Sequence, residues 1–395
     1  MAARGVPWRV YGGVAIARLH SLFLSLTLIA AALGAGSACA QGAAAARPAW
    51  PELLQDQLNQ VAAQNTAGIG VYVRDLESGI AVSHRGQERW YLASTVKIPV
   101  ALAVLQAVER GDFTLDTKLR LRASDYVDGA GHTNAKPVGT ALSIRYLIEQ
   151  MVIYSDNTAS DMLIGLVGIR AVSALVEQLV PRGFERITSL ADVRRHAYGH
   201  LTPQASHLSG HDFLVIKQQR SDADRVQVLS RLLHVPAVSF LLPSVGDAFE
   251  AYYASGLNSG RLDAYADLLE LLVNGKVLHA AHTRYLLGVM ERVQTGVHRV
   301  QAGLPRTARF AHKTGTQRAR TCDSGLVTVP RLGRDQRVIV VACTRGELSS
   351  ARSDRALRDV GAALCNSGLL TDGRTHDPEC PPVARVLHRA DPGER

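Results

Sequence analysis

The sequence has few aromatic residues, few charged residues and no long run of basic residues. Aromatic side chains make up 5% of its 395 residues and charged side chains 20%, whereas hydrophobic residues make up 47%. That much apolar content excludes a disordered chain and is enough for one large domain or two interleaved ones. The formal net charge is +9, but the basic residues are scattered with little aromatic interleaving, so we expect no nucleic-acid partner.

Cysteine is also scarce, and the body of the chain has no internal repeat or low-complexity segment. No pair among the five cysteines has the spacing of metal ligands. Two histidine pairs at helical spacing, His196/His200 and His207/His211, have no cysteine or carboxylate partners at fixed spacing. We therefore expect no metal ion and no other cofactor.

The first forty residues have the pattern of an export signal. Arginines precede an apolar run over residues 22–33, and Ala38-Cys39-Ala40 offers a small-x-small cleavage site. The apolar run is too short and too poorly flanked for a stable membrane span. Cleavage after Ala40 is preferred to lipid attachment at Cys39, because Gly36 stands where a lipoprotein signal usually has a branched aliphatic residue. The sequence predicts an exported protein, periplasmic or secreted.

Cleavage of the signal would leave four cysteines in a disulfide-permitting compartment. Cys322 and Cys343 flank a predicted hairpin and lie nearly opposite each other if its register is symmetric. Cys365 and Cys380 would then tie the C-terminal tail to the last helix. This is one of three possible pairings, and free buried thiols are the alternative.

Strand patterns lie at the two ends of the chain and helical patterns lie between them. Residues 68–75 and 80–83 alternate like a hairpin, and strand patterns return only from 310 to 343. The terminal strands must therefore pair with each other around an inserted helical block. We expect an α/β (α+β) fold, with a mainly antiparallel sheet of about five strands flanked by helices, beside an all-helical domain.

The predicted parts of the chain follow from these patterns. They are a signal peptide (1–40), a linker (41–50), the first part of the α/β domain (51–117), a helical domain (118–279) with a long insertion at about 190–258, the second part of the α/β domain (280–370) and a tail (371–395). Helices are expected at 53–63, 143–154, 158–167, 169–179, 259–274 with Ser259 as its cap, 281–295 and 353–365. Residues 186–258 show only a few short helical patterns.

Ser94 and Lys97 lie three residues apart where another helix is expected to begin. Apolar residues at helical spacing follow as far as Gly111, so Ser94 is predicted in the first turn. Residues three apart share a helix face, so the Lys97 amine is expected to reach the Ser94 hydroxyl. A lysine whose pKa is lowered by burial or by other cations can take the proton of such a serine. Alone, this spacing is more often a helix cap followed by a surface lysine.

Ser155-Asp156-Asn157 lies in a predicted turn between two helices. All three residue types cap helices well, which is the ordinary explanation of such a stretch. The functional alternative is that the Ser155 hydroxyl passes a proton to a leaving group while the Asn157 amide holds Lys97 and the substrate.

Lys313-Thr314-Gly315-Thr316 lies on a predicted strand. The ordinary explanation is a strand edge with a turn glycine. The functional alternative is a cation and a hydroxyl that bind a substrate carboxylate, with Gly315 letting the ligand lie against the backbone.

These three motifs, in this order and on helix, loop and strand, resemble the penicillin-recognising serine enzymes, most closely the class A β-lactamase family. The separation of Ser94 and Ser155 fits that family, as do Tyr154-Ser-Asp-Asn-Thr-Ala159 and the run from Tyr265 through Leu304 to Lys313. The resemblance covers about residues 55–366.

The resemblance implies an acyl-enzyme on Ser94, formed by attack on a strained amide carbonyl. Lys97 would take part in removing the proton, Ser155 would relay a proton to the amide nitrogen, and Asn157 would orient Lys97 and the acyl side chain. Substrate binding would fall to Lys313, Thr314, Gly315 and Thr316, with the N–H groups of Ser94 and Thr316 as oxyanion hole. The expected partner is a small molecule, a β-lactam or a D-Ala-D-Ala-like peptide, and the expected state is a monomer.

Two departures from the family pattern leave deacylation open. Residues 186–192 lack the glutamate that activates water in class A enzymes, and about fifty extra residues follow. The candidate bases nearby are Glu185, Asp192, the four histidines named above and Glu250. Ser324 stands where many class A enzymes have an arginine, which Arg318 or Arg320 would replace, and Gly129 replaces an aromatic residue.

The expected function is therefore a serine β-lactamase-like hydrolase with two alternatives. One is a D,D-peptidase or other serine hydrolase that acts on peptidoglycan-type substrates. The other is a penicillin-binding sensor that is acylated once without turnover, which the lack of a recognisable span or signalling domain disfavours.

Overall fold

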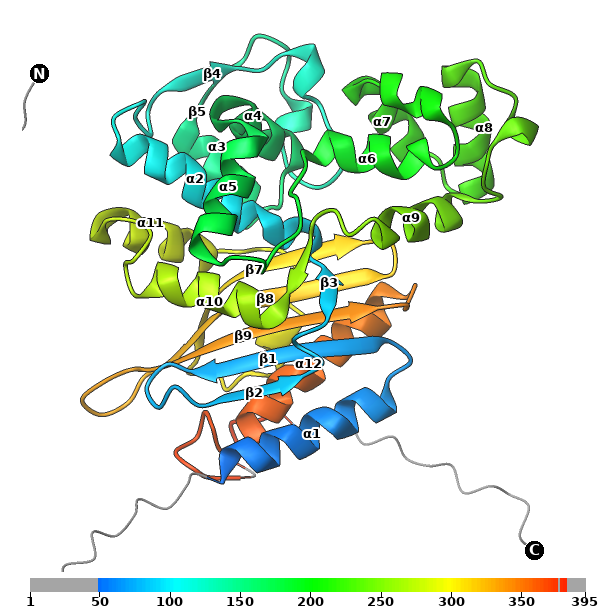
Figure 1. Ribbon diagram of the computed structural model, residues 1–395. Coiled ribbons are helices and arrows are strands. Elements are labelled where there is room, and N and C mark those ends of the chain that lie inside the picture. The colour runs from blue at the N-terminus through cyan, green and yellow to red at the C-terminus, as the bar shows by residue number, and fades with distance from the viewer. Residues whose placement is uncertain (1–48, 376, 382–395) are drawn as a thin grey trace, which may run out of the picture. The chain divides into compact units, whose positions relative to one another are not determined.

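Figure 1 shows the computed structural model, which describes residues 49–375 and 377–381. The predicted signal peptide, with Cys39, and most of the linker lie outside these residues. Five strands form an antiparallel sheet in the order β2-β1-β9-β8-β7. Their bounds are β1 (Gly68–Asp75), β2 (Ala81–His84), β7 (Arg309–Gln317), β8 (Arg320–Val329) and β9 (Gln336–Arg345). Since β1 pairs with β9 over its whole length, the predicted pairing of the two chain ends is confirmed.

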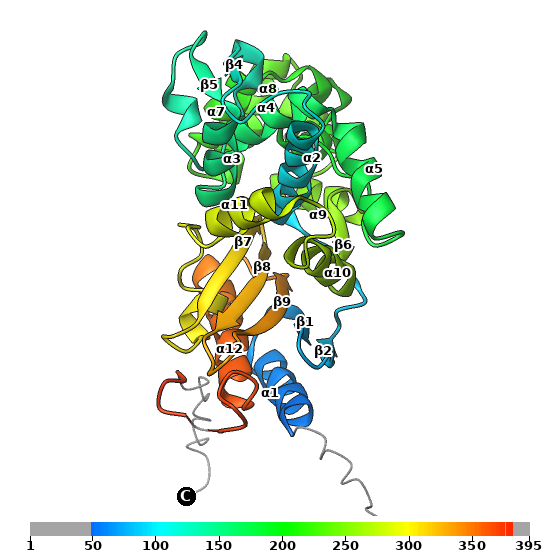
Figure 2. The same ribbon diagram turned by 90° about the vertical axis from the view of Figure 1, so that its left-hand side faces the viewer.

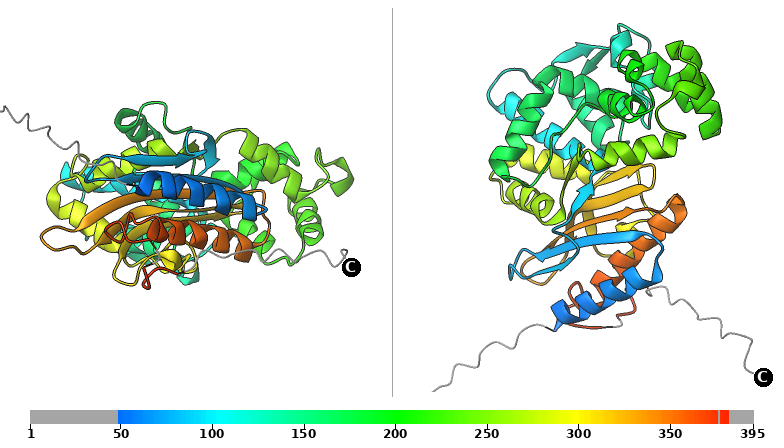
Figure 3. Two further views of the ribbon diagram at one scale, coloured as in Figure 1. Left: turned by 90° about the horizontal axis from the view of Figure 1, so that it is seen from below. Right: turned by 45° about the vertical axis from the view of Figure 1, so that its right-hand side comes forward.

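Both faces of the sheet are covered by helices, as the apolar strands require. On β9, Val338 and Val340 pack with α1 (Trp50–Gln64) and α12 (Ser350–Asn366), whereas Ile339 and Val341 belong to the larger core on the opposite face. Alternate side chains of a strand point to opposite faces, so one strand serves both cores. Figures 2 and 3 show α1 and α12 beneath the sheet and α10 (Leu262–Val273) and α11 (Ala280–Met290) above it.

The α2 helix (Lys97–Glu109) lies at the centre of the helical block. Ten of its residues are buried, among them Ile98, Leu102 and Leu105, because other helices enclose it. These neighbours are α3 (Ile144–Ile153), α4 (Asn157–Val167) and α5 (Ile169–Leu179). Two small ribbons complete the block, β3 (Arg89–Tyr91) with β6 (Ser259–Arg261) and β4 (Lys118–Arg120) with β5 (Ala141–Ser143).

The segment 186–258 folds into four helices, more regular than its sequence suggested. They are α6 (Leu190–Gly199), α7 (Gly210–Lys217), α8 (Asp222–Leu233) and α9 (Val245–Ala254). Each begins after a serine whose side chain accepts the backbone N–H of an aspartate three residues later. The pairs are Ser189/Asp192, Ser209/Asp212, Ser221/Asp224 and Ser244/Asp247. These aspartates therefore start helices, which accounts for four of the acidic residues in the segment.

Three expectations about helix ends are wrong. Ser259 does not cap α10: it pairs with Tyr91 in the β3–β6 ribbon, and this backbone pairing delays the helix until Leu262. Helix α11 stops at Met290 instead of Thr295. Ser94 lies on a separate 3₁₀ turn, η1 (Ala93–Val96), and α2 itself begins at Lys97. The predicted domain boundaries stay a prediction.

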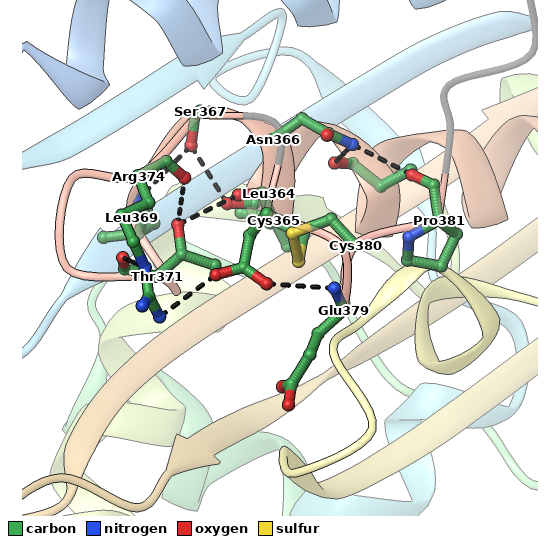
Figure 4. Close-up of a disulfide and its surroundings, with 12 residues drawn as sticks. Leu364, Cys365, Asn366, Ser367, Leu369, Thr371, Arg374, Glu379, Cys380 and Pro381 are labelled. Carbon is green, nitrogen blue, oxygen red and sulfur yellow. Dashed lines mark hydrogen bonds and ion pairs between the residues drawn. A yellow bond between two sulfur atoms is a disulfide. The ribbon is translucent and has the colours of Figure 1, made fainter.

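Both predicted disulfides form. Cys322 and Cys343 are cross-strand partners on β8 and β9, with Cα atoms 4.1 Å apart. Cys365 at the end of α12 bonds to Cys380 and ties down the tail (Figure 4). The Asn366 side-chain amide adds a hydrogen bond of 2.9 Å to the carbonyl oxygen of Pro381. Among the described residues, no single helix has the length and apolar character to cross a bilayer; α4 and α5 together would, but they meet at an angle of 83°.

Candidate active site

Three elements bring the predicted site residues around one cavity of about 630 Å³. Ser94 comes from η1, Ser155 and Asn157 from the turn that starts α4, and Thr314 and Thr316 from β7. The cationic side chains of Lys97 and Lys313 are fully buried beside them. Residues far apart in sequence therefore meet where the sheet edge faces the helical block.

The Lys97 amine is bound to the Ser155–Asn157 turn. Its Nζ donates to the carbonyl oxygen of Ser155 at 2.6 Å, to Ser155 Oγ at 3.3 Å and to Asn157 Oδ1 at 2.8 Å. These acceptors match the three donors of an ammonium, so the predicted bond to Ser94 is not among the contacts of Lys97. Burial lowers the pKa of Lys97 to about 7, and the cation of Arg194 acts in the same direction. A neutral amine with a free lone pair is thus accessible near neutral pH.

Ser155 Oγ is shared by two lysines. Lys313 Nζ donates to it at 3.0 Å and also to the carbonyl oxygen of Thr314 at 2.9 Å. Burial, together with the charges of Lys97 and Arg299, lowers the pKa of Lys313 well below its usual value. A hydroxyl that accepts from two cations has its own hydrogen left to donate, which suits a proton relay.

The Ser155-Asp156-Asn157 turn both starts a helix and contacts Lys97. Asp156 caps α4 by accepting the N–H of Ala159 at 2.9 Å, and its other oxygen accepts the N–H of Thr133. Ser155 adopts φ +59°, an uncommon conformation for a residue with a side chain, and so faces Lys97. Asn157 Nδ2 donates to the carbonyl oxygen of Asp128 at 2.6 Å. The capping residue thus leaves its two neighbours free to line the site.

Gly315 and Gly129 are required for close packing. A Cβ on Gly315 would lie 2.6 Å from the carbonyl oxygen of Leu92 and 3.2 Å from the Ser94 nitrogen, so glycine lets β7 approach η1. This differs from the expectation that Gly315 makes room for the ligand. A Cβ on Gly129, which has φ +145°, would lie 2.3 Å from the Asn157 amide nitrogen. A side chain at position 129 would therefore clash with Asn157.

The turn that bears Ser94 is fixed by contacts to its backbone. Ala93 adopts φ +48°, and the buried Tyr265 hydroxyl donates to the carbonyl oxygen of Thr95 at 2.9 Å. The Cys322 sulfur of the cross-strand disulfide lies 3.5 Å from the carbonyl oxygen of Tyr91. The disulfide and Tyr265 therefore support the backbone on both sides of Ser94.

Arg299 is a site residue that the sequence analysis missed. This nearly buried guanidinium donates to the carbonyl oxygens of Gly315 and Cys322, both at 3.1 Å, and to Thr316 Oγ1 at 2.8 Å. Asp354 pairs with its Nε at 2.7 Å. Arg299 thus fixes the part of β7 that faces Ser94. No motif marks it, because its partners are mostly backbone oxygens.

The candidate water-activating residues lie elsewhere. The residues that line the cavity include none of Glu185, Asp192, Glu250 and the four histidines. Glu185 pairs with Arg89, Asp192 with Arg195, and Glu250 with Arg320. The acidic residue of the lining is Glu347, whose pKa is lowered to about 2 by hydrogen bonds from Arg352 and others. A carboxylate held this strongly as an anion is a weak proton acceptor.

The two arginines that were expected to bind a substrate carboxylate lie in different places. Arg318 lines the cavity, whereas Arg320 lies over the ring of Tyr253 and pairs with Glu250. Ser324 is buried opposite Lys313 in the β7–β8 ladder. Within the described residues, no group of three or more His, Cys, Asp or Glu side chains is placed to hold a metal ion.

Solved structures with a similar fold include β-lactamases and a PBP-A protein. A β-lactamase from Burkholderia vietnamiensis has a TM-score of 0.61 and 22% identity, and the match covers 80% of this chain and 97% of that one. A PBP-A mutant, solved as its acyl-enzyme complex with penicillin G, has a TM-score of 0.60 and 21% identity, over 79% and 94%. These likenesses show a β-lactamase/transpeptidase-like fold, which confirms the predicted fold class.

The family follows from the sequence comparison. The protein-family model described as "Beta-lactamase enzyme family" matches residues 53–367, so the chain belongs to that family. Beta-lactamase ROB-1 of Haemophilus influenzae is 36% identical over 126 residues, 32% of this chain and 40% of that protein. A β-lactamase of Rhodobacter capsulatus is 31% identical over 143 residues, 36% and 48%. The chain spans less than half the length of the curated relatives it matches.

Proposed function

We propose that this protein is a serine hydrolase of the class A β-lactamase type, which opens the β-lactam ring through an acyl-enzyme on Ser94. The observation that carries the proposal is the buried cluster in which Lys97 and Lys313 both bind Ser155 Oγ beside the Ser94 cavity. Two desolvated lysines on one hydroxyl are costly for stability, and such perturbed groups in a cavity mark functional sites.

In this proposal each residue has one task. Ser94 attacks the carbonyl carbon, and the neutral Lys97 amine accepts its proton. Ser155 delivers its hydroxyl proton to the departing nitrogen and receives the proton that Lys97 took from Ser94, through the Lys97–Ser155 contact of 3.3 Å. Asn157 orients Lys97 and the acyl part of the substrate. Lys313, Thr314 and Thr316 bind the substrate carboxylate, on the strand that Gly315 keeps close to η1.

The oxyanion hole of this proposal consists of the backbone N–H groups of Ser94 and Thr316. Gly315 lets these two backbones lie close together, and Arg299 fixes Thr316 through its hydroxyl. Donors fixed in this way stabilise the charge of the tetrahedral intermediate by about 3 kcal/mol each.

A second function, a penicillin-binding D,D-peptidase with slow deacylation toward β-lactams, is favoured by one observation. The acidic residue of the cavity lining is Glu347, which is engaged by Arg352, so the site offers no evident base for water. Acylation is expected in both cases, and only the fate of the acyl-enzyme differs. We further propose that the protein is exported, periplasmic or secreted, and monomeric; the two disulfides support export.

The test mixes purified protein with benzylpenicillin and with a chromogenic cephalosporin, and follows turnover and intact mass. Wild type is expected to gain one acyl group, which Ser94→Ala should abolish. The control is Ser239→Ala, an exposed serine of the segment 186–258. Many turnovers that Ser94→Ala abolishes would establish a β-lactamase, and a stable adduct would indicate a peptidase or sensor. The absence of both turnover and adduct would refute the proposal.

A further inference from the structure

The cavity contains cations beyond the two lysines of the proposed reaction. Arg194, Lys217 and Arg318 also line it, and the first two belong to the segment 186–258. That segment is attached to the turn between β7 and β8 by two polar contacts. The Tyr253 hydroxyl donates to the carbonyl oxygen of Arg318 at 2.9 Å, and the Arg318 side chain pairs with Asp222 at 2.9 Å. Helices α6 and α7 of the segment 186–258 therefore form a wall of the cavity.

Arg194 is nearly buried but keeps donors free toward the cavity. Its side chain is 12% exposed, and its Nε binds Asp128 Oδ1 at 2.7 Å. Within the described residues, its two terminal nitrogens have no hydrogen-bond acceptor. The Asp128 carbonyl oxygen accepts the Asn157 amide, so Arg194 lies one residue away from the group that orients the acyl part in the proposed function. A guanidinium with both terminal nitrogens free in a cavity is suited to bind a carboxylate.

Lys217 adds a second available charge. It ends α7, its side chain is exposed, and no ion pair holds it within the described residues. Arg318, by contrast, is engaged by Asp222, and Glu347 is engaged by Arg352. The charge that remains for a ligand on this side of the cavity is therefore positive.

We propose that Arg194 and Lys217 form an anion subsite that binds a carboxylate on the acyl part of the substrate. The preferred substrates would then be acyl donors with a second carboxylate, besides the one bound at Lys313. This inference rests on the proposed function, since that function defines which part of the substrate is acyl. It assigns a role in substrate selection to helices α6 and α7 of the segment 186–258.

The test compares two penicillins that differ by one carboxylate, α-carboxybenzylpenicillin and benzylpenicillin. Binding is measured by calorimetry at low salt in Ser94→Ala, which needs no acylation. We expect the dianion to bind about tenfold more tightly. Lys217→Gln should reduce this preference about two- to fivefold, as for an exposed ion pair. Arg194→Gln combined with Asp128→Asn, which leaves no unpaired buried charge, should reduce it further.

The matched control is Lys276→Gln, an exposed lysine between α10 and α11 that is not part of the cavity lining. Equal binding of the two penicillins, including no binding of either, or a preference that survives in both subsite variants, would overturn the subsite. Failure of wild-type Ser94 to be acylated would refute the proposed function alone, because the binding comparison does not use the hydroxyl.

Discussion

The Ser94 cluster and the segment 186–258 contribute to the same cavity in different ways. In the cluster, charged groups are buried and share acceptors, as with Lys97 and Lys313 on Ser155. In the segment, the aspartates start helices at the surface, and other acids are paired with arginines. In the proposed function the cluster therefore holds the groups needed for acylation, while the segment contributes positive charge and no evident base. If this difference governs function, changes in the cluster should affect acylation strongly and changes to the acids of the segment very little.

The largest effect is expected from Lys97→Met. Loss of the proton acceptor should slow acylation of Ser94 by about 10²- to 10⁴-fold. The measurement is the second-order rate constant for benzylpenicillin, by quenched-flow mass analysis. Lys276→Met serves as the control, since that lysine is exposed. A Lys97 variant with near wild-type acylation would show that another group takes the proton.

The pH dependence of acylation should report the same lysine. Burial lowers the pKa of Lys97 to about 7, so below that pH the amine is an ammonium without a lone pair. The acylation rate should therefore fall about tenfold for each pH unit below about 7 and level off above it. Rates from pH 5 to 9 would show this profile. A rate that stays flat between pH 5 and 7 would contradict the role of neutral Lys97.

Arg299→Lys tests the support beneath the cluster. Lysine keeps the positive charge but cannot bind Gly315, Cys322 and Thr316 together, so the β7 backbone opposite Ser94 should shift. We expect about tenfold slower acylation, because small displacements of reacting groups are costly. Thermal unfolding is measured in parallel, with the exposed Arg306→Lys as control. Equal acylation by both variants would mean that Arg299 does not position Thr316.

The smallest effects are expected from the acids of the segment. Asp192→Asn and Glu250→Gln should change the deacylation rate by less than about twofold, since surface substitutions of this kind rarely matter. The rate is followed as the loss of the acyl-enzyme mass after removal of free penicillin. A tenfold slower loss in either variant would identify that residue as the base that activates water. It would also show that the segment 186–258 takes part in deacylation.

The residues around the cavity could in large part be predicted, because they belong to short sequence motifs. Ser94, Ser155 and Asn157 line one cavity, and Lys97 and Lys313 are buried beside it, although Ser94 lies on a 3₁₀ turn and not on the expected helix. Their roles stay predictions. The four helices of the segment were missed, although each carries a serine followed three residues later by an aspartate. The apolar patterns of these helices are short, and the capping signal alone does not predict a helix.

The sequence by itself determined the strands of the five-stranded sheet, the central helices and the motif residues, because hydrophobic periodicity and local capping are properties of neighbouring residues. Only the tertiary structure selected the disulfide pairing among the three that the four cysteines allow. Only the tertiary structure decided that Lys97 binds the Ser155 turn instead of Ser94, that Gly315 serves packing, and that Arg299 and Arg194 belong to the site. Those features depend on contacts between segments far apart in the chain, and burial there sets the pKa values on which the proposed chemistry rests.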